Sequence, residues 1–133
     1  MEIADSYTVL MNSKLKGTLA VTKCIAKLYE KGFEVFLPLG DRMPYDLIFD
    51  DGKYLKKVQV KYSGKNSRGK YVAALRVMGG NQTYCYAKKY NDNDFDYLFV
   101  YTADDRHFLI KWNEVECRNE IHVDDKKYQK YKL

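Results

Sequence analysis

Three residues of this 133-residue chain could together hold a divalent metal ion and a phosphate group: Asp46, Gln59 and Lys61. Gln59 and Lys61 alternate with apolar residues, so we predict that both project from one face of a strand. Asp46 precedes an apolar stretch that ends in an Asp-Asp-Gly turn, and a hairpin would place its carboxylate beside that face. Mg²⁺ accepts carboxylate and amide oxygens, and an ammonium group stabilises charge on a phosphate. The pattern indicates a candidate site for phosphate chemistry.

These residues must be positioned by one helix and several strands. Near-helical spacing of apolar residues predicts an amphipathic helix from Lys14 to Lys31, capped by Asn12 or Ser13 and ended by Gly32. Strands are expected over residues 33–37, 45–49, 53–63, 71–77, 96–102 and 107–112, with Gly79-Gly80 as a break. Residues 82–90 fit either a short helix or an irregular crossover, and Asn113 could cap another short helix.

The chain length fits a single domain that we expect to be α/β or α+β, with a core over about residues 14–112 and a tail over 113–133. Residues 63–70 are expected to form a flexible basic loop, and the tail from Asp124 to fold only against a partner. Three widely spaced cysteines, Cys24, Cys85 and Cys117, are expected to be buried or half-buried free thiols. Together with the lack of a secretion signal or a long apolar run, they predict a cytoplasmic protein without a membrane span.

Positive charge is concentrated in the middle of the chain. Residues 52–91 contain ten lysine and arginine residues and no aspartate or glutamate, although the net charge of the whole chain is only +5. Such a segment suits a polyanion better than a small acid.

The order of these features resembles the PD-(D/E)XK nuclease superfamily. The half-motifs are Pro44-Tyr45-Asp46 and Gln59-Val60-Lys61, and they follow a helix that contains Lys16-Gly17 and Leu19-Ala20-Val21. With Gly32 to Val35, Pro38 and Asp94 to Tyr97, the sequence is similar to small bacterial, cyanobacterial and phage endonucleases, including group I intron-encoded homing endonucleases. The resemblance covers about residues 14–112. It implies a restriction-endonuclease-like core, in which helices flank a mixed sheet.

The resemblance also implies an activity, the Mg²⁺-dependent hydrolysis of double-stranded DNA at a specific site, with Mn²⁺ as a substitute metal. Asp46, Gln59 and Lys61 would be the catalytic residues, and Asp46, Gln59 and the Val60 carbonyl would hold the metal. Cutting both strands would require a homodimer or homotetramer. A Holliday junction resolvase-like enzyme and a catalytically degenerate DNA-binding module on the same scaffold are the alternatives.

The residues expected to contact DNA come from the basic segment and from the polar face of the strand: Lys57, Ser63, Lys65, Arg68, Lys70, Arg76, Lys88 and Lys89. The sequence departs from the family pattern in two ways. Gln59 stands where an acid is usual, and the comparable positions on the first helix, Thr18 and Val21, are not acidic. We therefore predict weak Mg²⁺ affinity in the absence of DNA.

Overall fold

The computed structural model describes the backbone of residues 12–80 and 85–133, and the side chains of residues 12–76 and 89–133. One α-helix, α1 (Ser13–Glu30), precedes the strands β1 (Glu34–Phe36), β2 (Leu47–Asp50), β3 (Leu55–Lys65), β4 (Tyr71–Ala74), β5 (Arg76–Gly80), β6 (Cys85–Lys89), β7 (Tyr97–Thr102), β8 (His107–Lys111) and β9 (Glu120–His122). Two 3₁₀ helices, η2 (Trp112–Glu114) and η3 (Lys126–Tyr131), lie near the C-terminus.

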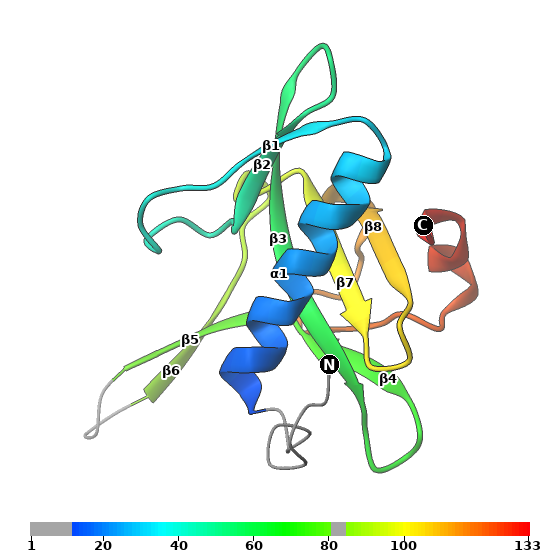
Figure 1. Ribbon diagram of the computed structural model, residues 1–133. Coiled ribbons are helices and arrows are strands. Elements are labelled where there is room, and N and C mark those ends of the chain that lie inside the picture. The colour runs from blue at the N-terminus through cyan, green and yellow to red at the C-terminus, as the bar shows by residue number, and fades with distance from the viewer. Residues whose placement is uncertain (1–11, 81–84) are drawn as a thin grey trace, which may run out of the picture.

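The main sheet is mixed, as the sequence predicted, and the long strand β3 is its centre. β3 pairs antiparallel with β2 and, near its end, with β4, whereas β7 pairs with it in parallel. β1 extends the sheet beyond β2, and β8 extends it beyond β7. Helix α1 lies across one face of this sheet (Figure 1). The α+β class expected from the sequence is confirmed.

Helix α1 begins and ends as its capping residues predict. The Asn12 side chain accepts a 2.9 Å hydrogen bond from the Leu15 N–H. At the other end Gly32 adopts a φ of +87°, which turns the chain so that the Phe33 N–H donates to the Leu28 carbonyl at 3.0 Å. This left-handed residue is the usual end of a helix, because glycine has no Cβ to oppose it. Between the caps, Ala20, Cys24 and Leu28 recur every four residues and are buried against the sheet.

The face of β3 that the alternation predicted to be polar is largely buried. Gln59 is only 8% exposed and Ser63 is 0% exposed. On the neighbouring strand β7, Gln59 pairs with Leu98 and Ser63 pairs with Thr102, so all four side chains lie on one face of the sheet. An apolar cluster that includes Leu98 and Trp112 covers this face. Polar and apolar residues do alternate between the two faces of β3 as predicted, but tertiary packing buries both faces.

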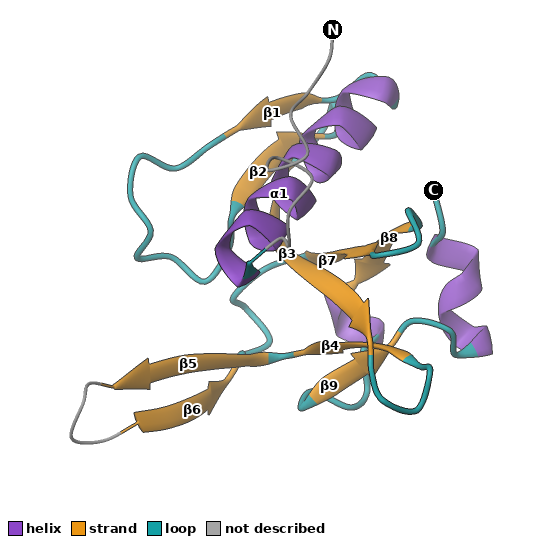
Figure 2. Ribbon diagram, turned by 60° about the horizontal axis from the view of Figure 1, so that its bottom comes forward, coloured by secondary structure: helices purple, strands orange, loops and turns teal. Residues whose placement is uncertain are grey.

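The region after β4 corrects two further predictions. The expected strand 71–77 is divided into β4 and β5, and β5 continues through Gly80 instead of breaking at Gly79-Gly80. Within residues 82–90, the described part forms strand β6, which pairs antiparallel with β5, and neither a helix nor an irregular crossover. The two strands form a separate ribbon that projects away from the main sheet (Figure 2).

The C-terminal segment is part of the fold, so the prediction that it folds only against a partner was wrong. Its apolar residues Val115, Ile121, Val123 and Tyr128 are buried in the same cluster as Trp112. The expected helix capped by Asn113 is instead η2, which begins at Trp112 and has no side-chain cap.

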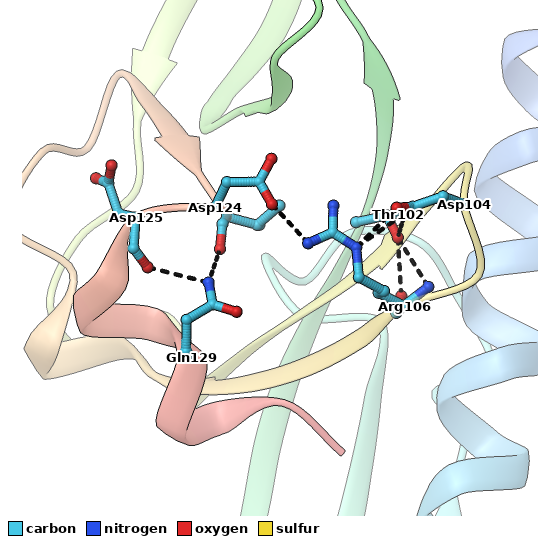
Figure 3. A network of polar contacts seen from close by, with 7 residues as sticks. Thr102, Asp104, Arg106, Asp124, Asp125 and Gln129 are labelled. Atoms are coloured by element: carbon cyan, nitrogen blue, oxygen red, sulfur yellow. Dashed lines mark hydrogen bonds and ion pairs between the residues drawn. The ribbon is translucent and has the colours of Figure 1, made fainter.

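Polar contacts fasten this segment to the turn between β7 and β8 (Figure 3). Arg106 pairs with Asp104 at 2.9 Å and with Asp124 at 2.5 Å. The Gln129 amide donates to the backbone carbonyls of Val123 and Asp125.

Two of the cysteines are described, and both are free: Cys24 is buried as expected, but Cys117 is exposed. In the described part of the chain, no helix is both long enough and apolar enough to cross a membrane.

Candidate active site

Asp46 lies directly before β2, at the point where the pairing of β2 with β3 stops and one edge of β3 is left unpaired. The last strand pair is Leu47 with Val58, and the Asp46 N–H donates to the Val58 carbonyl at 2.8 Å. Its carboxylate Oδ2 then accepts the Val60 N–H at 2.8 Å, taking the place of a strand partner. In an antiparallel pair the N–H and C=O of one residue point to the same side. The Val60 carbonyl therefore faces the same edge as the Asp46 carboxylate.

An open cleft of about 450 Å³ lies at this edge, between β3 and the N-terminal half of α1. Its lining residues are Ser13, Lys14, Gly17, Thr18 and Val21 from the helix, together with Asp46, Gln59 and Val60. The positions identified from the sequence as comparable to a helix acid, Thr18 and Val21, thus do face the site. Neither they nor the other helix residues of the lining carry a carboxylate.

Gln59 is a neutral member of this lining. Its amide Nε2 donates to the Val60 carbonyl at 3.3 Å. Within residues 12–76 and 89–133, no group of three or more His, Cys, Asp or Glu residues is placed to hold a metal ion. Besides the Ser13 and Thr18 hydroxyls, the described lining offers a metal one carboxylate, one amide and one backbone carbonyl, which is a sparse set of hard donors.

Burial raises the pKa of Asp46 above its ordinary value, and two favourable interactions oppose this increase. These are the hydrogen bond from Val60 and the positive charge of Lys61. Lys61 does not line the cleft itself. Its ammonium nitrogen lies 5.1 Å from the centre of the Tyr90 ring. The structure thus brings the charge of Lys61 within electrostatic reach of Asp46.

The residues predicted to contact DNA lie in different parts of the fold, and some of them are exposed. Lys65, Arg68 and Lys70 are exposed at the turn between β3 and β4. Because β3 extends to Lys65, the expected loop over 63–70 is shortened to a turn, in which the Asn66 side chain accepts hydrogen bonds from the N–H groups of Arg68 and Lys70. Lys89 is exposed at the end of β6. The side chain of Lys88 lies outside the described residues.

Of the remaining candidates, Lys57 and Arg76 are held by other protein groups and Ser63 is buried. The Lys57 ammonium donates to the Asn93 carbonyl at 2.8 Å. The exposed Arg76 donates to the Asn119 side chain at 2.8 and 3.3 Å. Ser63 is fully buried, and its hydroxyl has no hydrogen-bond partner among the residues that the structure describes. The hydroxyl is closed off from solvent, so the prediction that Ser63 contacts DNA was wrong.

Sequence reasoning missed two parts of the site. Ser13 and Gly17 line the cleft beside Val21, and their four-residue spacing along the helix was a signal that could have identified them. Tyr90 gave no such signal, because only the folding of the β5–β6 ribbon brings it to Lys61.

Comparison with known proteins identifies the family to which the chain belongs. Residues 11–132 match the model of a family described as PD-(D/E)XK endonuclease. A comparison with curated proteins found no similar sequence. Among solved structures, the chain is similar to one described as a bacterial homing endonuclease, I-Ssp6803I, with a TM-score of 0.77 and 32% identity over 92% of this chain and 89% of that one. The chain therefore belongs to the PD-(D/E)XK endonuclease family and is a DNA endonuclease.

Proposed function

We propose that this protein cleaves double-stranded DNA at specific sites by Mg²⁺-dependent hydrolysis in the cleft at Asp46, within the cytoplasm. The observation that carries the proposal is the convergence of the Asp46 carboxylate and the Val60 carbonyl on one unpaired edge of β3. The similar homing endonuclease motivates the site-specific part of the proposal.

The oxygens of the cleft fit a Mg²⁺ ion that is shared with substrate. In the described part of the chain, Asp46 Oδ1 accepts no hydrogen bond, so this oxygen is free for a metal. Rotation of the Gln59 amide would bring its oxygen close to the Val60 carbonyl oxygen. The metal would then have three protein ligands: the oxygens of Asp46, Gln59 and Val60. Mg²⁺ usually keeps several waters and uses one or two carboxylates plus substrate phosphates. When bound, it would polarise a phosphate oxygen and lower the pKa of a bound water, and Mn²⁺ has similar preferences.

Lys61 would stabilise the negative charge that develops on the scissile phosphate. Its ammonium group carries three donors and already acts on Asp46 through its charge. Because Lys61 is not in the lining of the cleft, the phosphate would lie between the cleft and the lysine.

DNA binding would use the cations of two segments, the β3–β4 turn and the β5–β6 ribbon. Lys65, Arg68 and Lys70 lie on the β3–β4 turn, and Lys89 with Lys88 on the β5–β6 ribbon (Figure 2). Arg76 and Lys57 could also contact DNA if they released, or kept only in part, their hydrogen bonds to Asn119 and Asn93. The cleft that we identify is one site, so cutting two antiparallel strands favours a homodimer or homotetramer.

The experiment is a cleavage assay on plasmid DNA and on a synthetic four-way junction, with Mg²⁺, with Mn²⁺ and with a chelator. We expect metal-dependent cleavage of duplex DNA at discrete positions, and loss of that cleavage in Lys61→Ala. Lys31→Ala is the matched control, because Lys31 is exposed beyond the C-terminus of α1. Cleavage that persists in the chelator, or equal rates for the two lysine variants, would contradict the proposal.

One observation favours a second candidate, a DNA-binding module that has lost catalysis. Among the described residues that line the cleft there is a single carboxylate, and the helix supplies none. This candidate predicts salt-sensitive DNA binding with no cleavage in any metal. Preferential cutting of the junction over the duplex would instead identify a resolvase-like enzyme.

A further inference from the structure

The ammonium group of Lys61 rests on the face of an aromatic ring supplied from a distant part of the chain. Its Nζ lies 5.1 Å from the centre of the Tyr90 ring, within the range of a cation–π interaction. Lys61 belongs to the central strand β3, whereas Tyr90 directly follows β6. We propose that Tyr90 is a positioning residue that holds the Lys61 ammonium in place for DNA cleavage. This inference rests on the catalytic role proposed for Lys61.

Tyr90 is itself held firmly. It is 7% exposed, and its ring makes edge contacts with Phe95 at 5.1 Å and with Trp112 at 6.2 Å between ring centres. The Trp112 indole N–H donates to the carbonyl of Asn91, the residue next to Tyr90, at 3.0 Å. A ring fixed on its edges and on its neighbouring backbone has little freedom to move. It therefore presents a constant surface to the lysine.

Lys61 needs such a surface because a lysine side chain has four rotatable bonds and a point charge at its end. In the described part of the chain, no carboxylate forms an ion pair with Lys61 and no acceptor receives a hydrogen bond from it. The ring thus replaces the carboxylate that usually fixes a partly buried ammonium group. A carboxylate there would neutralise the charge that the phosphate requires, whereas a neutral ring leaves it available.

The position of Tyr90 connects the β5–β6 ribbon to the site. The ribbon stands away from the main sheet (Figure 2), and the chain returns from it through Lys89 to Tyr90. The residue that orients Lys61 is therefore at the base of a segment that carries exposed positive charge.

The first test is an NMR measurement on the wild-type protein and requires no catalysis. The ring should shift the Lys61 Hε resonances upfield from those of exposed lysines, with the assignment made by their loss in Lys61→Arg. The shift should disappear in Tyr90→Leu and persist in Tyr90→Phe, which keeps the ring. The matched control is Tyr128→Leu, since Tyr128 is a buried tyrosine of the same apolar cluster and has Lys127 above its ring.

The second test is single-turnover cleavage with saturating enzyme, with DNA affinity measured separately. Tyr90→Leu should slow cleavage about tenfold, the size of a partly desolvated cation–π interaction, without weakening DNA binding. Tyr90→Phe and Tyr128→Leu should remain close to wild type. An absent upfield shift in the wild type, an unaltered rate in Tyr90→Leu, or an equal loss in Tyr128→Leu would overturn the inference. If Lys61→Ala cleaves as fast as wild type, the proposed function of Lys61 fails, whatever the NMR shift shows.

Discussion

The carboxylate of Asp46 accepts a 2.8 Å hydrogen bond from the backbone N–H of Val60. At this position β2 no longer pairs with β3, and the side chain of Asp46 takes the place of a strand partner for Val60. The hydrogen bond orients the carboxylate toward the cleft and leaves its second oxygen free among the described residues. The proposed metal anchor is thus also a structural partner of the strand that carries the other two donors.

Asp46→Asn should make the protein inactive but more stable at neutral pH without metal. Burial raises the pKa of Asp46, so ionisation is less favourable in the folded than in the unfolded chain. Wild-type stability therefore falls as pH rises from the ordinary value of 3.8 through the folded-state pKa. The asparagine has no such loss and can still accept the Val60 N–H. Thermal unfolding should show a higher Tm for the variant at pH 7, and this advantage should disappear toward pH 4 or below.

Gln59→Glu should strengthen Mg²⁺ binding by the DNA-free protein, because it adds a second carboxylate to a cleft that has one. We expect affinity to rise by about tenfold or more in isothermal titration calorimetry. Gln59→Leu, which removes the amide oxygen, is the comparison and should weaken binding. If neither substitution changes the affinity, Gln59 is not a metal ligand.

The pair Arg68→Ala and Lys70→Ala should weaken DNA binding at low salt and reduce its salt dependence. Each phosphate contact adds about 0.9 to the slope of log affinity against log salt, so removing two contacts should lower the slope by nearly two. Fluorescence anisotropy at several salt concentrations measures this slope. Lys31→Ala, which removes an exposed charge beyond the C-terminus of α1, should leave it unchanged. The same slope in all three proteins would exclude the β3–β4 turn from the DNA interface.

Arg106→Ala should loosen the C-terminal segment without changing the cleft. The substitution removes ion pairs to Asp104 and Asp124 and the stacking of Arg106 on Tyr71 at 5.0 Å. We expect a loss of about 1–3 kcal/mol in the free energy of unfolding, measured by urea denaturation. Lys130→Ala breaks an exposed pair with Glu114 and should lose at most about 0.5 kcal/mol. Similar losses in both variants would show that the network of Figure 3 does not fasten the segment.

Local signals explain why the helix, the hairpin and the half-motifs could be predicted from the sequence. Asn12 and Gly32 define the helix through their own side-chain and backbone properties. Asp50 and Asp51 shape the hairpin turn by accepting hydrogen bonds from the N–H groups of the residues that follow them. Such contacts lie within a few residues, so the sequence shows them directly.

Features that depend on distant pairing could not be predicted. Ser63 is buried because a second apolar cluster covers its face of the sheet. The residues of that cluster are distant from Ser63 in the sequence, so the local pattern does not predict the burial. The C-terminal segment is polar in sequence, but Tyr128 anchors it in the core. The contact between Lys61 and Tyr90 likewise requires the β5–β6 ribbon, whose sequence fitted other structures equally well.

The central claim, that Asp46 anchors Mg²⁺-dependent DNA cleavage, is tested most directly by the single-turnover rate of Asp46→Ala on duplex DNA. The control is Asp41→Ala, an exposed loop aspartate outside the cleft. We predict that Asp46→Ala slows cleavage at least about 100-fold at saturating DNA and Mg²⁺, as expected when a metal ligand is lost, and that Asp41→Ala cleaves at the wild-type rate. Equal rates for wild type, Asp46→Ala and Asp41→Ala would contradict the account.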